Sequence, residues 1–282
     1  MEYDNASLDG RVVFYERNHK YKLVDNPSFK FNSVTTLLKQ YHESFDSARI
    51  SQEMSEKVGS IYYGMSTDEI LDLWSKKAKK ASGEGTLLHA YGEDLLNGKT
   101  PDPPALAKAR WVPRIIAEIK DNFKYELAKT ELLVYSEIVQ LAGQSDIILK
   151  KKWGDDEHYS YAIYDWKFLG KPLEKKSFYN PKTRTYKKML YPFQHLLDCN
   201  WIHYSIQLAF YQTMSGDPVK IKEKVLMVVY DDSYEFVPCY PMRVFWDTNH
   251  QLQAVYEIFN GKVYDSRVDK FLDKWPNDIV GR

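Results

Sequence analysis

The sequence contains few cysteines and no long apolar run. Its two cysteines, Cys199 and Cys239, are too few for a disulfide framework or for the four thiolates that usually hold an iron–sulfur cluster. No apolar segment approaches the roughly 20 residues of a membrane helix, and the polar start, Met1 to Asn5, resembles neither a signal nor a transit peptide. We therefore expect no iron–sulfur cluster, no membrane association and a cytoplasmic location.

The chain also lacks net charge, because its 39 basic and 39 acidic residues balance. A protein of this kind binds a polyanion only where its positive charge is concentrated on one surface. The segment 171–188 meets this requirement, because aromatic residues lie among its basic residues and its only acid is Glu174. The basic residues are Lys171, Lys175, Lys176, Lys182, Arg184, Lys187 and Lys188. We expect phosphate pairing and base stacking along this segment, and the alternative is a solvated loop.

Two smaller lysine clusters occur elsewhere in the sequence. One precedes the helix predicted around His89 and consists of Lys76, Lys77, Lys79 and Lys80. The other consists of Lys150, Lys151 and Lys152, and it falls near the tip of a predicted hairpin. We expect this second cluster to serve solubility, because the hairpin tip lies far from the candidate site described below.

Two strand-like segments carry carboxylates within otherwise apolar runs. Residues 141–150 and 159–168 are rich in apolar and aromatic residues, and the turn-forming residues between them predict an antiparallel hairpin. The midpoint of the sequence between Asp146 and Asp165 falls inside this turn. A hairpin centred on the turn therefore pairs these two residues and brings their carboxylates together. Lys167 then shares the face of Asp165, because side chains two residues apart on a strand point the same way.

Opposed carboxylates destabilise a sheet interior unless another group compensates their charge. Mg²⁺ or Mn²⁺ is a suitable partner, because both ions prefer oxygen ligands. We therefore expect one or two ions at Asp146 and Asp165, with Lys167 orienting a water or a phosphate. The alternative is a structural hairpin, in which Asp165 and Lys167 form a partly solvated ion pair and Asp146 stands at a strand end.

Two predicted helices supply further candidate residues. His89 and Glu93 are four residues apart and share one face of a helix that ends before an Asn-Gly pair. Gln207 and Tyr211 have the same spacing in a helix predicted over 201–214. Taken alone, each pair also fits an ordinary structural role. A helix histidine is usually a surface residue or has its hydrogen bonds satisfied within the protein, and a glutamine and tyrosine at this spacing usually cap the core.

In this order, the four segments resemble the PD-(D/E)xK nuclease superfamily, specifically its RecB-like and phage exonuclease branch. That branch carries a Gly-x-x-x-His helix followed by an acid, a Gly-x-x-Asp strand, an Asp/Glu-x-Lys strand and a Gln-x-x-x-Tyr helix. The corresponding residues are Gly85, His89 and Glu93, then Gly143 and Asp146, then Asp165 and Lys167, and finally Gln207 and Tyr211.

The resemblance implies an α/β fold of the restriction-endonuclease type, with a central mixed β-sheet flanked by helices. We expect a single domain over 1–282, in which 1–80 form an N-terminal hairpin and a mostly helical lobe and 81–282 form the catalytic core. Further strands are predicted over 11–15, 21–24, 131–139, 224–230 and 234–240, and helices over 33–41, 67–81, 105–127 and 243–259. Glu137 is a candidate accessory acid, with a surface position as the alternative.

The resemblance also implies metal-assisted hydrolysis of a phosphodiester, leaving 5'-phosphate and 3'-hydroxyl ends. Lys167 is expected to position the attacking water, while Gln207 and Tyr211 hydrogen-bond and stack on the scissile nucleotide. The expected ligands of Mg²⁺ or Mn²⁺ are Asp146, Asp165 and the main-chain carbonyl of Trp166, assisted by His89 or Glu93 directly or through water.

These expectations predict a DNA exonuclease that acts on single-stranded DNA or on a duplex with a free end. It would serve recombination, repair or replication of a phage or mobile element in the host cytoplasm, with a partner such as a single-strand-binding or annealing protein. Two alternatives stay open: a structure-specific or nicking endonuclease, and a catalytically idle nucleic-acid binder that keeps the fold. The sequence does not encode polarity, strand preference or the choice between DNA and RNA.

Overall fold

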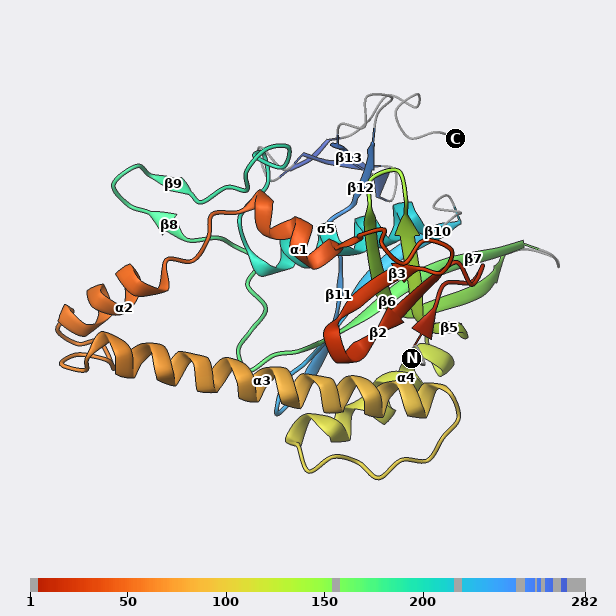
Figure 1. Cartoon of the computed structure of the whole chain (residues 1–282), viewed down its shortest axis with the longest axis horizontal. Coiled ribbons are helices and arrows are strands. Elements are labelled where there is room, and N and C mark those ends of the chain that lie inside the picture. Colours follow the sequence, from red (N-terminus) through yellow and green to blue (C-terminus); the bar gives the residue numbers. More distant parts are fainter. Residues whose placement is uncertain are drawn as a thin grey trace.

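The centre of the molecule is a six-stranded mixed sheet (Figure 1). The computed structural model describes residues 5–153, 158–215, 220–246, 252–256, 258–259, 262–265 and 270–272. The strand order is β11-β10-β7-β6-β4, and β5 also pairs with β6. The strands are β4 (Asn32–Ser33), β5 (Glu126–Ser136), β6 (Leu141–Trp153), β7 (His158–Phe168), β10 (Ile221–Val229) and β11 (Tyr234–Pro238). Because β10 is parallel to β7 and β6 is antiparallel to it, the predicted mixed sheet is confirmed.

Helices cover both faces of this sheet, as predicted. They are α3 (Thr67–Leu96), α4 (Val112–Asp121) and α5 (Asn200–Met214). Along β7, Ile163 packs into the core on the α5 side, whereas Tyr164 and Trp166 pack into the core that includes α3 and α4. This alternation is the period of two expected for a strand buried on both faces.

The predicted 141–168 hairpin is confirmed, because β6 and β7 pair antiparallel from Trp153 with His158 to Ile147 with Tyr164. Of the predicted turn residues, Trp153 ends β6, and Gly154, Asp155 and Asp156 lie outside the described part of the chain. The long, regular ladder fixes the faces of all its side chains, since a slip of one residue would move each to the opposite face.

A small antiparallel sheet near the N-terminus packs against β5. Its strands are β1 (Asn5–Ala6), β2 (Val12–Tyr15) and β3 (Lys20–Leu23), which confirm the hairpin predicted over 11–15 and 21–24. Buried residues of β2 and β3 form one cluster with Leu133 of β5. The predicted helix over 33–41 is also present, as α1 (Val34–Leu38) followed by a 3-10 helix (Lys39–Tyr41). The region 1–80 therefore contains this sheet in addition to its helices.

Helix α3 is longer than predicted. The separate helices expected over 67–81 and 85–96 are one helix of 30 residues that begins with a capping box between Ser66 and Glu69. Gly83 and Gly85 do not interrupt it, because a glycine inside a helix costs only about 1 kcal/mol relative to alanine. Within the described residues, neither this helix nor any other combines the length and apolar composition needed to cross a membrane.

Two other helix predictions need correction. The helix expected over 105–127 is a 3-10 helix (Ala107–Trp111) and α4, and a positive φ of 58° at Lys124 turns the chain before β5 begins. The helix expected over 243–259 is wrong, since β12 (Met242–Trp246) pairs antiparallel with β13 (Leu252–Tyr256). Buried Met242 and Val244 alternate with a half-buried Arg243, which is a strand period rather than a helical one.

The basic segment forms a small hairpin rather than an irregular loop. Its strands are β8 (Tyr179–Asn180) and β9 (Thr185–Tyr186). Beyond β13, the described strands are β14 (Ile258–Phe259), β15 (Lys262–Asp265) and β16 (Lys270–Leu272), which pair in that order.

Candidate functional site

The register of β6 and β7 places Asp146 opposite Asp165, as predicted. The last pair of the ladder is Ile147 with Tyr164, and one further step along both strands reaches the two aspartates. The backbone N–H of Trp166 donates a hydrogen bond of 2.9 Å to Oδ2 of Asp146. Because the N–H and C=O of a strand residue point to the same side, the Trp166 carbonyl also faces β6, as a ligand role would require.

A third acid, Glu131 of β5, lies level with these two aspartates. The β5–β6 ladder pairs Thr130 with Ile147, and the same register continues beyond Glu131, so Glu131 lies opposite Asp146. Its φ of 48° lies in the left-handed region that residues other than glycine rarely adopt. Glu131, Asp146 and Asp165 thus occupy one level of three neighbouring strands.

Neighbouring side chains hold Glu131 in this conformation. The Asn5 amide donates a hydrogen bond to its main-chain carbonyl, and the Gln144 amide donates one to its carboxylate. An uncommon φ that surrounding groups stabilise is typical of functional positions.

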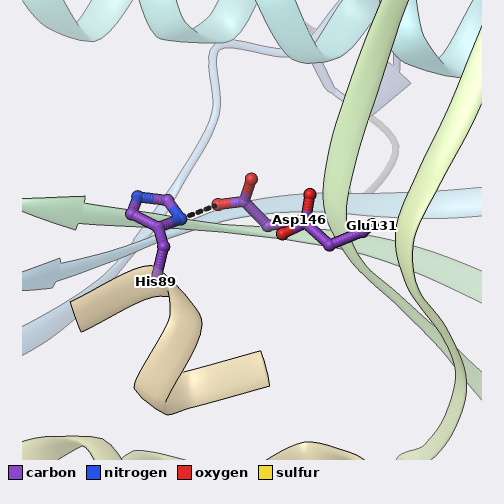
Figure 2. A group of neighbouring side chains, drawn as sticks. All are labelled: His89, Glu131 and Asp146. Atoms are coloured by element: carbon purple, nitrogen blue, oxygen red, sulfur yellow. Dashed lines mark ion pairs between the residues drawn. The ribbon is translucent and has the colours of Figure 1, made fainter. Parts of the chain in front are cut away.

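His89 of α3 completes a group that could hold a metal ion. Its Nδ1 lies 3.4 Å from Oδ2 of Asp146, and ligand atoms of His89, Glu131 and Asp146 all lie within 4.8 Å of one another (Figure 2). The His89 ring packs edge-on against Phe168, with ring centroids 5.4 Å apart. Glu93 lies one helical turn beyond His89 and lines the same cleft, but it is outside this group.

The pKa values of the acids reflect their burial and mutual repulsion. Burial raises the pKa of Glu131 to about 8, with a further increase from the charge of Asp146, while the hydrogen bond from Gln144 opposes the shift. Burial also raises the pKa of Asp165 to about 6, against the lowering effect of Lys167. A cation bound beside Glu131 and Asp146 would offset this burial and repulsion.

Asp165 and Lys167 form an ion pair inside the protein. Lys167 Nζ contacts Oδ2 of Asp165, and the two side chains are only 14% and 3% exposed, respectively. Nζ also lies 4.7 Å from the centroid of the Tyr204 ring. Burial lowers the pKa of Lys167, but Asp165 and Asp146 outweigh it and leave that pKa raised. The ion pair of the structural alternative is thus present, although it is buried rather than partly solvated.

Gln207 and Tyr211 lie next to each other on α5. The Gln207 amide donates a hydrogen bond of 2.8 Å to the Tyr211 hydroxyl, and both residues line the cleft. The Tyr211 residue is only 4% exposed, and its ring lies so close to Gly143 that a Cβ there would collide with it. This close approach explains the glycine of the Gly-x-x-Asp motif. It also leaves little of the Tyr211 ring free to stack on a nucleotide.

Gly143, Gln207 and Tyr211 border a cleft of about 980 Å³. Its walls come from the N-terminal sheet, α1, α3, β5, β6 and α5, and they include His89, Glu131 and Asp146. Asp165 and Lys167 are not among the residues that line it. The basic residues of 171–188 do not line it either. Of the predicted metal ligands, the structure therefore brings His89 and Asp146 together, whereas Glu93 lies outside this group and Asp165 lies outside the cleft.

Sequence reasoning missed Glu131 and considered Glu137 instead. Glu137 forms an ion pair with Arg11 at 2.7 Å, and both side chains are solvent-accessible, so its surface alternative is confirmed. A usable signal was present, because the midpoint between Glu131 and Asp146 falls between Ile138 and Val139, in the turn that joins β5 to β6. The same midpoint rule correctly paired Asp146 with Asp165.

Comparison with known proteins leaves the family open. No protein-family model matches the chain, and no curated protein matches it. A solved structure titled "Crystal structure of SSO0001" is similar at 12% identity over 64% of this chain and 81% of that chain, with a TM-score of 0.23. That score is too low to support an argument, so the α/β class rests on the sheet and helices themselves.

Proposed function

We propose that this protein is a divalent-metal-dependent deoxyribonuclease with a fold of the PD-(D/E)xK type. The observation that carries the proposal is the alignment of Glu131, Asp146 and Asp165 on three adjacent strands, with His89 directed at the central acid. Three neighbouring acids in a largely buried setting destabilise the fold unless protons or a bound cation compensate their charge. The order of motifs along the chain supports a nuclease.

The residues present fit Mg²⁺ or Mn²⁺. Glu131 and Asp146 offer hard oxygen ligands, and His89 offers a nitrogen within the same group. Asp165 and the Trp166 carbonyl are the remaining candidates for an ion on the β7 side. When bound, such an ion supplies a water of lowered pKa and neutralises charge that develops on the phosphate oxygens.

The groups around these ligands have separate tasks in the proposed reaction. The Trp166 N–H keeps the Asp146 carboxylate oriented, and the Gln144 amide does the same for Glu131. Lys167 stays protonated beside Asp165. To offer this charge to a phosphate oxygen or to the attacking water, its amino group has to leave the buried pair and enter the cleft, which it does not line in this structure. Gln207 and Tyr211 position Gly143 and its strand.

Cleavage from a DNA end is our preferred mode, and it rests on the resemblance to the phage exonuclease branch. The buried Asp165 and Lys167 pair favours a second candidate, a nucleic-acid binder without catalysis, because each of the two groups already neutralises the other. An endonuclease is the third candidate. Roles in recombination, repair or replication follow only if cleavage is found.

The test is hydrolysis of end-labelled DNA by the purified chain with Mg²⁺ or Mn²⁺. Linear and circular DNA, each single-stranded and duplex, should be incubated with the wild type, Asp146→Asn and Asp165→Asn. The surface variant Glu137→Gln is the matched control. We expect metal-dependent release of nucleotides from ends by the wild type and the control only. Cutting of closed circles would establish an endonuclease, and binding without cleavage would establish the idle binder.

A further inference from the structure

Two segments project from the same side of the core (Figure 1). The helical arm comprises residues 43–81, with α2 (Ser47–Glu56) and the first half of α3, and the hairpin arm comprises residues 175–191, with β8 and β9. Their bases are joined, because Leu190 N–H donates to the Tyr41 carbonyl at 2.7 Å and Lys187 Nζ lies 3.5 Å from Glu43 Oε2. These contacts place the arms beside each other.

The hairpin arm exposes aromatic rings at its surface. Phe178 is 71% exposed, Tyr191 is similarly exposed, and the rings of Tyr179 and Tyr186 lie 5.1 Å apart. Large apolar side chains gathered on a projecting segment, without a partner in the described structure, indicate a binding surface. Flat rings among basic residues suit the faces of unpaired bases.

The helical arm carries a second aromatic group. Phe45 is 66% exposed, and Tyr63 is also largely exposed. The rings of Phe45 and Tyr62 pack on Trp74 of α3, with centroid distances of 5.7 and 5.8 Å. Trp74 therefore holds these side chains at the arm surface instead of allowing them to turn inward.

The basic residues of the hairpin arm fall into two groups. Lys187 is structural, because Nζ lies 2.9 Å from Oδ2 of the buried Asp198 carboxylate, and Lys175 lies 3.6 Å from Glu235. Within the described residues, the other four form no ion pair and are exposed. These four are Lys176, Lys182, Arg184 and Lys188. Their positive charge complements a phosphate backbone.

One face of α3 leads from the arms to the metal centre. Lys79, Ser82, Thr86, His89 and Glu93 follow one another at spacings of three or four residues, so they share a face. The last four of these residues line the cleft. Lys79 is ten residues before His89, which corresponds to about 15 Å along the helix axis.

We propose that the arms bind single-stranded DNA and direct it along α3 to the His89, Glu131 and Asp146 group. This proposal rests on the nuclease function proposed above. Exposed rings on both arms can stack only on bases whose faces are free, whereas a duplex stacks its bases internally and leaves these faces covered. The arms therefore select a single strand or a single-stranded tail.

Binding is measured on the full-length chain in EDTA, so that cleavage cannot interfere. The probes are labelled oligothymidine and a blunt hairpin duplex with the same number of phosphates. We expect Phe178→Ala with Tyr186→Ala to weaken oligothymidine binding roughly 10- to 100-fold and to leave duplex binding unchanged. Ile138→Ala, at an exposed apolar position far along the chain from both arms, is the control.

A charge variant tests the phosphate contacts separately. Lys182→Ala with Arg184→Ala should reduce the slope of log affinity against log salt by about 0.7 per lost contact, for single strands. Lys152→Ala, an exposed lysine of β6, should leave the slope unchanged. Circular dichroism and thermal unfolding confirm that each variant folds.

Equal losses on both probes, or no binding of oligothymidine by the wild type, would overturn the proposal. So would a change in molar mass by light scattering in the aromatic variant, which would assign the rings to a contact between copies of the chain. Selective single-strand binding without metal-dependent cleavage would contradict the nuclease function while supporting the arms. Cleavage combined with a preference for duplex would support the nuclease function and contradict the proposed role of the arms.

Discussion

Oδ2 of Asp146 accepts a hydrogen bond of 2.9 Å from the backbone N–H of Trp166 and lies 3.4 Å from Nδ1 of His89. The same oxygen is therefore approached from β7 and from α3, which are far apart in the sequence. A carboxylate oriented from two elements is a preorganised ligand, because its rotamer is fixed before anything binds. Asp146 is thus the central ligand of the candidate metal site.

Asp146→Asn should weaken metal binding without unfolding the protein. The amide keeps the shape of the side chain and an oxygen that accepts from Trp166, but it removes the central negative charge. Calorimetric titration with Mn²⁺ measures the effect, and we expect at least a tenfold loss of affinity. Glu137→Gln removes a surface acid and should titrate like the wild type. Equal affinity in Asp146→Asn and the wild type would exclude this site.

Glu131→Gln should make the metal-free protein more stable and weaken its metal binding. The substitution relieves the repulsion from Asp146, and the Gln144 amide can still donate to the remaining oxygen. In EDTA at pH 9 we expect a gain on the order of 1 kcal/mol in the free energy of unfolding, measured by urea denaturation. A loss of stability would show that the Glu131 carboxylate serves a structural purpose.

The stability of the metal-free protein should fall as the pH rises from about 4.5 to about 8. Burial raises the pKa of Glu131 from 4.5 to about 8, so the folded state keeps a proton that the unfolded state releases. Stability then decreases with pH across this window, because the folded state binds more protons. The raised pKa of Asp165 acts in the same direction.

Urea titrations in EDTA across this pH range measure the effect, and Glu131→Gln should show a smaller slope. Added Mn²⁺ should oppose the loss of stability, because deprotonated acids bind it more tightly. A metal-free protein whose stability increases over the whole window would contradict the assigned pKa values.

Gly143→Ala should destabilise the protein by about 1–3 kcal/mol, since the added Cβ would overlap the Tyr211 ring. Gly83→Ala is the matched control, because no atom lies within 4 Å of the Cβ it would gain. In the interior of α3 this change should stabilise the protein by roughly 0.5–1 kcal/mol. Thermal unfolding of both variants, compared with the wild type, tests the pair. Equal behaviour of the two would exclude the close contact.

The central hairpin could be predicted from the sequence because several local signals agree. Its apolar runs have strand length, its turn residues lie between them, and the Asp146 and Asp165 register places the midpoint in that turn. The sequence predicts two helices where α3 is one, because Gly83 and Gly85 suggest a break, whereas the helix continues through both glycines. Packing of α5 against β12 also overrides the local pattern of 243–259, in which Arg243 begins a plausible helix.

The candidate site could be predicted in part for similar reasons. His89 and Asp146 were identified from motif spacing, and the structure brings them into contact. The sequence does not indicate Glu131, because its pattern predicts that β5 begins five residues too late and does not reveal the positive φ on which the role of Glu131 depends. The Asp165 and Lys167 ion pair follows from strand alternation as the structural alternative, but its burial depends on the surrounding side chains, which alternation alone does not determine.

The continuity of α3 has a consequence for the whole molecule. A helix of 30 residues is a stiff rod about 45 Å long, with Trp74 near one end and His89 towards the other. Leu88 and Tyr91, on either side of the histidine, are buried in the core, so this end of the rod is fixed to the sheet. The exposed end therefore stands at a set distance and direction from the imidazole.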